Sequence, residues 1–526
     1  MLPRFFSRIA DATVPLFDGL ARDELQARLA EVRVALVASE QVSNQLPLRR
    51  GYLLAANLFA RIYPTLTLDA PASLRDEAAE LARTINPKIE ILHQTHYDAP
   101  RLRFDGGQPQ AANEVTTWAS GWNVGIDGAL ADAQELAVIP AALAAGAIGV
   151  GEVFRIVFAE LLAPPRPREG MQPGSLNLIT LEERTEGLPL DLKGLDLGRV
   201  HLVGCGAIGE AFVEAIRGMG VEGTLVAVDP ERVEESNLQR YVLAGDTDER
   251  ALKTEIVKRA LDDDTITVEE VKARWGEADD ARLSVDVAAV GLDTPEDRVG
   301  VAASLPRRVY NAFTQPLDLG WSRHEEFGTR PCLACLYWPT HETLGRHEVI
   351  GKALEEAPRR VLAYLAMPWA VGRPLVRHQL GEPDPPSAEE AEAWMSRALI
   401  DDVLERFNRP ASERSRWAER DIEDLYRDGI CGGAILGNAP NDPARAVLVP
   451  LAHQSVLAGV MLAVQVLAAA NPALAAARPE LIEGRFDVLR GFPQAPPVPT
   501  ARPEGCLCFD ADFVVAANPQ PAAPAT

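Results

Sequence analysis

The chain has 526 residues, 47% of them hydrophobic, and a formal net charge of −24. Its length exceeds that of one ordinary domain and predicts two or three, and the hydrophobic fraction is high enough for packed cores rather than disorder. The 76 acidic residues against 52 basic ones argue against a nucleic-acid partner, because binding a phosphate backbone needs a basic surface.

The N-terminal residues lack the long apolar stretch and the small-residue cleavage site of a secretory signal. Six cysteines in a chain of this length are too few for a disulfide scaffold, so we expect a reducing, cytoplasmic location. The two most apolar runs, residues 138–162 and 447–470, contain polar side chains such as Glu152 and His453. We therefore expect buried helices and no membrane partner.

The first part of the chain, residues 1–165, has the pattern of an α/β domain but no glycine turn. Residues 32–37 predict a strand, and the turn after it is Ala38-Ser39-Glu40-Gln41. A helix is predicted over residues 51–62, a strand over 65–69 and a second helix, rich in small residues, over 141–161. We expect an inactive, degenerate copy of the domain that the second half forms.

The second half, from residue 199, predicts a parallel, doubly wound sheet, and a Pro-rich linker over residues 166–198 precedes it. A strand over 200–203 leads into the glycine turn Gly204-Cys205-Gly206-Ala207-Ile208-Gly209 and a helix to about residue 219. Further strands and one helix alternate after it, predicted over 223–228, 249–261 (the helix), 266–271, 285–291 and 308–313. The expected fold class is α/β with two Rossmann-like, doubly wound domains, the second of which has its first part in residues 199–340.

The glycine turn has the spacing Gly204-x-Gly206-x-x-Gly209, between a predicted strand and a predicted helix. Glycines allow a tight turn and a close approach to phosphates, and the helix N-terminus favours their charge. Asp229 lies 20 residues beyond the last glycine, at the end of the next strand, where a carboxylate can bind ribose hydroxyls. Taken alone, these features favour an NAD-dependent oxidoreductase.

A longer motif begins at Asp229. The sequence Asp229-Pro230-x-x-Val233-Glu234-x-Ser236-Asn237-Leu238-Gln239-Arg240 resembles the signature Asp-x-Asp-x-Val-x-x-Ser-Asn-Leu-x-Arg-Gln of the ThiF/MoeB and ubiquitin-activating enzyme family. Lys253 matches the triphosphate-binding lysine of that family, and Asp293 matches its magnesium-linked aspartate. Tyr241 stands where the signature has glutamine, and Glu231 or Arg232 stands where it has a second aspartate.

This resemblance implies an ATP-dependent adenylating enzyme that uses ATP and Mg²⁺. A carboxylate attacks the α-phosphate of ATP and pyrophosphate leaves, so the protein has to position the phosphates and neutralise charge. An oxidoreductase has no use for a lysine, an arginine and a metal-binding aspartate beside the phosphates. We expect catalysis to depend on Asp293, Arg240 and Lys253, and the nucleotide to contact these residues together with Gly204, Gly206, Ala207, Ile208, Gly209, Asp229 and Asn237.

Four of the six cysteines form two close pairs, Cys332-x-x-Cys335 and Cys506-x-Cys508. Four thiolates in two pairs fit a tetrahedral structural Zn²⁺ site, which the family also carries, normally from two Cys-x-x-Cys pairs. The alternative is four ordinary buried thiols. Cys205, inside the glycine turn, is interpreted as a small turn residue.

The sixth cysteine, Cys431, stands between glycines after a charged, helix-like stretch over residues 341–430 that we interpret as a helical insertion. In relatives that form a thioester, the catalytic cysteine lies between the two zinc pairs. We therefore expect Cys431 to be the nucleophile, because nucleophilic catalysis needs an accessible thiolate. The alternative is a free cysteine in a tight turn. Residues 431–513 are expected to complete the active domain, and 514–526 to form a disordered tail.

Two adenylation-like halves in one chain, without a C-terminal ubiquitin-like domain, resemble a bacterial version of the ubiquitin-activating enzymes. That resemblance implies a ubiquitin-like protein and a conjugating enzyme as partners, in a conjugation pathway tied to antiviral defence against phage. The family also borrows an arginine from a partner adenylation unit, for which Arg4, Arg8, Arg49 and Arg50 are candidates. The alternatives are a sulfur-carrier-protein adenylyltransferase without a thioester and an NAD-dependent oxidoreductase, and a homodimer stays open.

Overall fold

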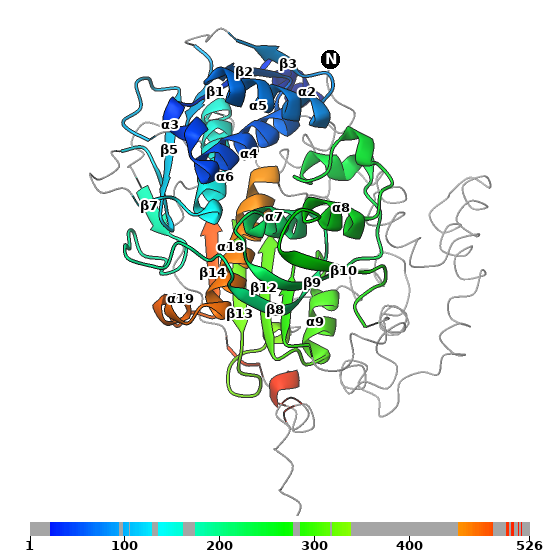
Figure 1. The fold of residues 1–526 in the computed structure, drawn as a ribbon. Helices are drawn as coiled ribbons and strands as arrows, with labels where there is room; N and C mark the ends of the chain where they lie inside the picture. The colour runs from blue at the N-terminus through cyan, green and yellow to red at the C-terminus, as the bar shows by residue number, and fades with distance from the viewer. Residues whose placement is uncertain are drawn as a thin grey trace, which may run out of the picture.

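The structure is a computed structural model that describes residues 22–93, 98–104, 106–128, 135–160, 174–276, 285–315, 318–337, 451–487, 501–503, 506–509, 514 and 517. Within these ranges the chain forms two seven-stranded sheets, one in each half. The strand order is β3-β2-β1-β4-β5-β6-β7 in the first sheet and β10-β9-β8-β11-β12-β13-β14 in the second. Because both sheets follow the same order along the chain, the two halves share one topology (Figure 1).

Each sheet has a parallel part followed by two antiparallel strands. The strands of the first sheet are β1 (Arg33–Val37), β2 (Thr65–Asp69), β3 (Glu90–Leu92), β4 (Arg101–Arg103), β5 (Glu114–Ser120), β6 (Asn123–Ile126) and β7 (Gly174–Asn177). Those of the second are β8 (Asp196–Val203), β9 (Glu222–Val228), β10 (Ile266–Val271), β11 (Val287–Val290), β12 (Arg308–Thr314), β13 (Asp318–His324) and β14 (Glu483–Asp487). Apolar residues dominate β1 and β11, as expected for parallel strands buried on both faces.

The helices of the first half are α2 (Arg22–Glu31), α3 (Glu40–Asn44), α4 (Leu46–Ile62), α5 (Ala72–Ile85) and α6 (Ile139–Val157). Those described in the second half are α7 (Ala207–Ile216), α8 (Lys253–Ala260), α9 (Pro295–Ala303), α10 (Leu333–Tyr337), α18 (Ala452–Ala470) and α19 (Pro472–Ala477). Short 3-10 turns are η2 (Glu235–Gln239), η3 (Asp246–Asp248) and η7 (Leu507–Phe509).

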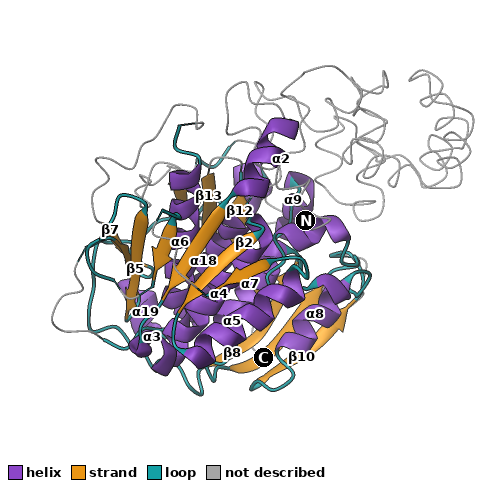
Figure 2. Ribbon diagram, turned by 90° about the horizontal axis from the view of Figure 1, so that it is seen from above, coloured by secondary structure: helices purple, strands orange, loops and turns teal. Residues whose placement is uncertain are grey.

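The small-residue helices α6 and α18 lie beside each other where the two halves meet, and α4 and α7 pack against them (Figures 1 and 2). Their glycines permit a close approach: a Cβ on Gly146 would lie 2.6 Å from the carbonyl oxygen of Gly51, and one on Gly459 would lie 2.4 Å from that of Ile208. Both helices are long and apolar enough to cross a membrane, but 94% of each apolar window is buried in the protein. They are core helices, as expected.

The predicted fold class is confirmed, with two corrections to the predicted elements. The linker over 166–198 is wrong in part, because β7 pairs with β6 and completes the first sheet. The helix predicted from residue 249 begins only at Lys253, because Arg250 has a φ of 74°, outside the helical region. The helical insertion over 341–430 and nearly all of the tail from 514 lie outside the described residues.

Candidate nucleotide-binding site

The glycine turn after β8 has room for glycine alone at the first and last of its three motif positions. Gly204 has a φ of 94°, and a Cβ on it would lie 2.9 Å from the carbonyl oxygen of Gly291. A Cβ on Gly209 would lie 2.3 Å from the carbonyl oxygen of Gly204, so the first turn of α7 packs directly on the strand. Gly206 is the N-cap residue of α7, whose N-terminal amides therefore open onto the turn.

The first half has the same backbone arrangement without the space. Ala38 and Gly204 make the same hydrogen bond to the end of the neighbouring strand, which places alanine where the second half has its first glycine. In the same way Phe104 corresponds to Gly291. The ring of Phe104 is buried against Gly51 of α4, at the position of the turn. The structure thus gives a physical reason for expecting no nucleotide in the first half.

Asp229 connects the glycine turn to the turn after β9. Its two carboxylate oxygens accept hydrogen bonds from the backbone N–H groups of Cys205, at 2.9 Å, and of Glu231, at 2.8 Å. Burial raises the pKa of this carboxyl, and the nearby charge of Lys253 opposes that effect. Asp229 therefore fixes the shape of the turn at the strand end where the sequence predicts it.

Lys253 is the first residue of α8 and is buried. Its ammonium group lies at the turn after β9, next to Glu231. It forms an ion pair with the carboxylate of Glu231 and lies 5.4 Å from the centre of the Tyr241 ring. Burial alone would lower the pKa of Lys253, but Tyr241, Asp229 and Glu231 together raise it well above its ordinary value. A buried, permanently charged ammonium group is suited to binding a phosphate, which would replace the exposed carboxylate of Glu231.

Tyr241 was not predicted as a site residue, but it lies at the centre of this cluster. Its ring is buried, and the guanidinium of Arg240 lies 5.7 Å from the ring centre. Its hydroxyl oxygen would lie 3.1 Å from a Cβ on Gly206, so it reaches the glycine turn itself. The structure thus brings Arg240, Tyr241 and Lys253 together beside the turn.

Asn237 shapes the loop that follows β9, residues 229–244, which begins with the family signature motif and is called the signature loop below. Its side-chain oxygen accepts a hydrogen bond from the N–H of Glu234, 3.0 Å away, and caps η2. The backbone N–H of Arg240 in turn donates to the carbonyl of Asn237, at 2.9 Å. The spacing from Asn237 to Arg240 is therefore the spacing of one tight turn that presents the arginine.

Asp293 follows β11 and is exposed, two residues beyond the Gly291 that packs on the glycine turn. Thr294 then caps α9 by accepting from the N–H of Asp297, at 3.1 Å. Arg298 is buried and donates to the carbonyl of Leu292 and to that of Ala312. Arg298 thus positions the segment that carries Asp293.

Two of the candidate arginines for the site are engaged elsewhere. Arg49 forms an ion pair with Glu77, and Arg50 forms one with Glu214, toward the C-terminal end of α7. Arg4 and Arg8 lie outside the described residues. Arg61 of α4 contacts the signature loop instead, and no sequence pattern marks it beyond its place in the last turn of a helix.

Glu210 of α7 lies beneath the same loop and is fully buried, with its carboxylate accepting from the N–H of Leu243 at 2.7 Å. Burial raises its pKa from the ordinary 4.5 to about 7. Between these values the native state keeps a proton that the unfolded chain has lost, so this group's contribution to stability falls as the pH rises. Across the whole window the loss is about 3 kcal/mol, at about 1.4 kcal/mol for each pKa unit.

Replacing Glu210 with glutamine is therefore expected to flatten the fall in melting temperature from about pH 5 to about pH 7 and to raise the melting temperature at about pH 8. The glutamine is neutral at every pH, and its carbonyl can still accept from Leu243. Calorimetry compares the wild type, Glu210→Gln and a control variant, Glu222→Gln, in which an exposed glutamate of β9 is replaced. A Glu210→Gln profile parallel to that of the wild type would contradict this assignment.

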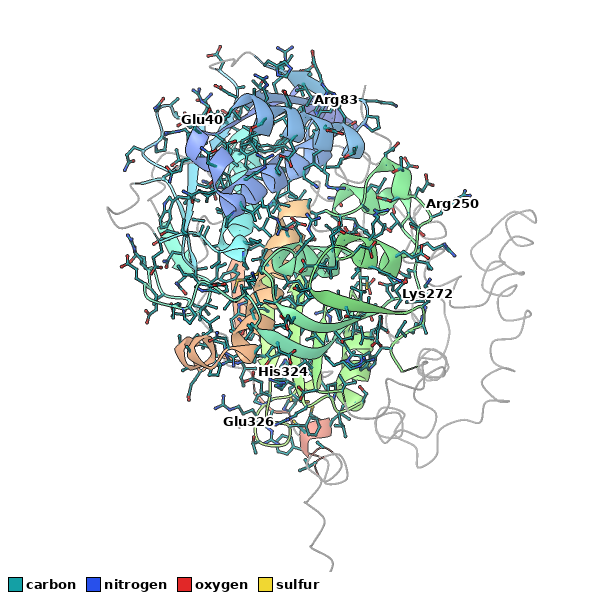
Figure 3. The ribbon with its side chains drawn as sticks, viewed as in Figure 1. Glu40, Arg83, Arg250, Lys272, His324 and Glu326 are labelled. Atoms are coloured by element: carbon teal, nitrogen blue, oxygen red, sulfur yellow. The ribbon has the colours of Figure 1, made fainter. Side chains whose placement is uncertain are left out.

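The four paired cysteines meet at the end of the second sheet opposite to the glycine turn. Their sulfur atoms all lie within 4.8 Å of one another, and the side chains are buried. The shortest separations, 3.4 Å, join Cys335 to Cys506 and to Cys508, and Cys332 lies 3.8 Å from Cys335. His324, next to the segment that leads to Cys332, appears in Figure 3 at the far end of the molecule from Glu40 and Arg83 of the first half. This cluster is thus remote from the first half.

The two remaining cysteines differ in accessibility. Cys205 is fully buried, and burial raises the pKa of its thiol well above the ordinary value. A protonated, buried thiol is not a nucleophile, in agreement with its interpretation as a small turn residue. Cys431 lies outside the described residues.

Residues 185–306, which include the glycine turn, the signature loop, Lys253 and Asp293, match the ThiF family. Residues 55–167 match a family described as the BilD N-terminal domain. The chain is also 29% identical over 530 aligned positions to the uncharacterized protein y4jF of Sinorhizobium fredii (strain NBRC 101917 / NGR234), a match that covers 98% of this chain and 96% of that protein. The resemblance to the ThiF/MoeB and ubiquitin-activating superfamily is thus confirmed.

Two solved structures are similar over part of the chain. The crystal structure of Escherichia coli MccB with ATP is 19% identical with a TM-score of 0.25, covering 40% of this chain and 56% of that one. The crystal structure of selenomethionine PaaA is 21% identical with a TM-score of 0.21, covering 24% of this chain and 40% of that one. Each match spans less than two thirds of the solved protein, so the family assignment rests on the domain match instead.

Proposed function

Since residues 185–306 form a ThiF-family domain, whose family-level activity is ATP-dependent adenylation of a substrate, we propose that this protein activates the C-terminal carboxylate of a ubiquitin-like protein. The observation that supports the reaction most is the position of Lys253. Its charge is kept inside the protein, at the glycine turn, and Arg240 lies against the same Tyr241 ring. Such an arrangement neutralises phosphates and serves no purpose in hydride transfer.

In this reaction an oxygen of the substrate carboxylate attacks the α-phosphorus of ATP. The bond from that phosphorus to the bridging oxygen of the β-phosphate breaks, pyrophosphate takes the electron pair, and the product is an acyl adenylate. The amides at the N-terminus of α7 and the charges of Lys253 and Arg240 hold the phosphates in line. Asp293 would offer an oxygen ligand for Mg²⁺, and an ion held there would supply positive charge against the phosphates.

The choice of nucleotide separates this proposal from an NAD-dependent oxidoreductase. We expect ATP with Mg²⁺ at saturating concentration to raise the melting temperature by several degrees, because a ligand that binds only the native state stabilises it by about 2.7 kcal/mol at a hundred times its Kd. NAD at the same concentration should leave the melting temperature unchanged. A shift with NAD and none with ATP would reverse the assignment.

After adenylation we propose transfer to Cys431. Its thiolate attacks the carbonyl carbon of the acyl adenylate, AMP leaves, and the ubiquitin-like protein is held as a thioester before it passes to the cysteine of a conjugating enzyme. Support comes from the accessibility of the other thiols: the five cysteines in the described part of the chain are all buried. A bacterial, cytoplasmic conjugation pathway that defends against phage is the setting we propose.

We propose that the cluster of Cys332, Cys335, Cys506 and Cys508 holds a structural Zn²⁺ ion. Zn–S bonds of about 2.3 Å at tetrahedral angles place sulfur atoms about 3.8 Å apart. Four of the six separations between the clustered sulfurs are 3.4–3.8 Å, and all six are within 4.8 Å, close to that geometry. Bound there, the ion would join the C-terminal segment to the start of α10.

Replacing Cys506 with serine is expected to remove the metal and to lower the melting temperature. Metal analysis of the purified protein should find about one zinc per chain in the wild type and almost none in the variant. Cys205→Ala, which removes a buried thiol outside the cluster, should keep its zinc. Equal metal content in the wild type and in Cys506→Ser would show that these four residues are ordinary buried thiols.

A further inference from the structure

The signature loop of the second half is held by side chains from the first half. Helix α4 lies directly against this loop, above α7 in the view of Figure 1. Asn57 and Arg61, one helical turn apart on α4, both point into it. The loop section involved, residues 238–244, includes Arg240 and Tyr241, the two side chains placed beside the glycine turn.

Arg61 makes three hydrogen bonds, two of them to the ends of this section. Its guanidinium donates to the carbonyl of Leu238 and, at 2.8 Å, to the carbonyl of Ala244. Its Nε donates to the side-chain oxygen of Asn57, also at 2.8 Å. The amide group of Asn57 then donates to the carbonyl of Val242, at 2.9 Å. Three loop carbonyls on either side of Arg240 and Tyr241 are therefore bound by two residues of α4.

The burial of Arg61 shows that α4 and the signature loop meet in the protein interior rather than at its surface. Its side chain is fully buried, and burial lowers its pKa to about 10, which leaves it charged at neutral pH. A buried cation is costly unless polar groups surround it, and here the carbonyls of Leu238 and Ala244 and the side-chain oxygen of Asn57 do so. Because guanidinium geometry is rigid, the two carbonyls it joins are held at a fixed separation.

We infer that Asn57 and Arg61 are positioning residues of the nucleotide site, through which the first half sets the geometry of Arg240 and Tyr241. Through these two residues the first half would contribute to ATP binding without either side chain contacting ATP. This inference rests on the proposed function only in taking residues 238–244 as part of the ATP site. It assigns a specific task to a half that has Ala38 and Phe104 where the second half has Gly204 and Gly291.

Arg50 provides a matched comparison on the same helix. It also crosses to the second half, where it pairs with Glu214 and donates to the carbonyl of Arg217. These contacts lie at the C-terminal end of α7, away from the glycine turn at its N-terminus. A variant of Arg50 therefore weakens the contact between the halves without touching the signature loop.

The experiment compares Asn57→Ala, Arg61→Met and Arg50→Met in the full-length chain. Calorimetric titration with ATP and Mg²⁺ gives the Kd, and hydrogen exchange gives the protection of the backbone amides in 238–244. We expect Asn57→Ala and Arg61→Met each to raise the Kd by about tenfold or more, because each loses hydrogen bonds to buried loop carbonyls. Both variants should also lose protection of the Leu243 amide. Arg50→Met should lower the melting temperature and leave the Kd within about twofold.

Arg61→Lys tests whether geometry or charge alone is required. A lysine keeps the cation but cannot join the two carbonyls, so its Kd should stay close to that of Arg61→Met. If Asn57→Ala and Arg50→Met change the Kd equally, or if Asn57→Ala is folded and binds ATP like the wild type, the inference is wrong. Failure of the proposed function is distinguishable: the wild type would then bind ATP but support no reaction with any carrier protein.

Discussion

Replacement of Asp293 by alanine is expected to lower ATP–pyrophosphate exchange by about a thousandfold, because the adenylation transition state loses the ligand that places Mg²⁺ on the leaving pyrophosphate. The side chain is exposed and follows β11, on a segment that Arg298 holds by the carbonyl of Leu292. Its loss should therefore leave the fold intact, with a melting temperature close to that of the wild type. Exchange is measured with a saturating carrier protein over a range of Mg²⁺ concentrations.

Asp286→Ala is the control for this variant. Asp286 lies directly before β11, at the opposite end of that strand from Asp293, and pairs with Arg308. Its replacement therefore removes a carboxylate that lies away from the glycine turn. Exchange by this control should stay within about twofold of the wild type, as for most surface substitutions. Undiminished exchange by Asp293→Ala would remove Asp293 from the reaction and with it the proposed role in binding Mg²⁺.

Replacement of Cys431 by alanine should separate the two proposed steps completely. Adenylation uses no thiol, so exchange should persist, whereas the reductant-sensitive adduct between this chain and the carrier protein should disappear. Non-reducing gels of reactions with ATP, followed by treatment with dithiothreitol, detect the adduct. Transfer to a conjugating enzyme should be lost with it.

The control for this variant is Cys205→Ala. Cys205 is buried in the glycine turn, where burial raises the pKa of the thiol, so it has no part in a thioester and its variant should still form the adduct. An adduct that survives in Cys431→Ala would make Cys431 a structural residue. If wild-type protein forms no adduct while exchange proceeds, transfer of sulfur without a thioester becomes the better account.

Local patterns in the sequence predicted the second half well. The glycine spacing, the acidic residue 20 positions on and the alternation of strands and helices all depend on short-range geometry, and the strand predicted over 266–271 has those bounds in the structure. Asp229 and Lys253 were found because the family signature fixes their spacing, and the structure places both at the turn. The cysteine pairs were found by spacing as well, and the fold brings them within 4.8 Å.

The parts that the sequence did not predict depend on contacts between distant segments. β7 has the sequence Gly174-Ser175-Leu176-Asn177, which has no β-branched residue, and pairing with β6 makes it a strand. Arg61 looks like a solvated arginine in the last turn of a helix until the second half covers it. Tyr241 and Glu210 were missed for the same reason, since only tertiary packing places Tyr241 beside the glycine turn and Glu210 beneath the signature loop.

The central claim, adenylation of the C-terminus of a ubiquitin-like protein, is tested most directly by ATP–pyrophosphate exchange. The purified chain is incubated with ATP, Mg²⁺, labelled pyrophosphate and candidate ubiquitin-like proteins, each with its intact C-terminus and with that carboxylate amidated. Exchange should appear with one intact carrier and vanish with its amidated form, because the carboxylate oxygen is the attacking atom. Absence of exchange with every carrier, or exchange that is indifferent to amidation, would contradict the account.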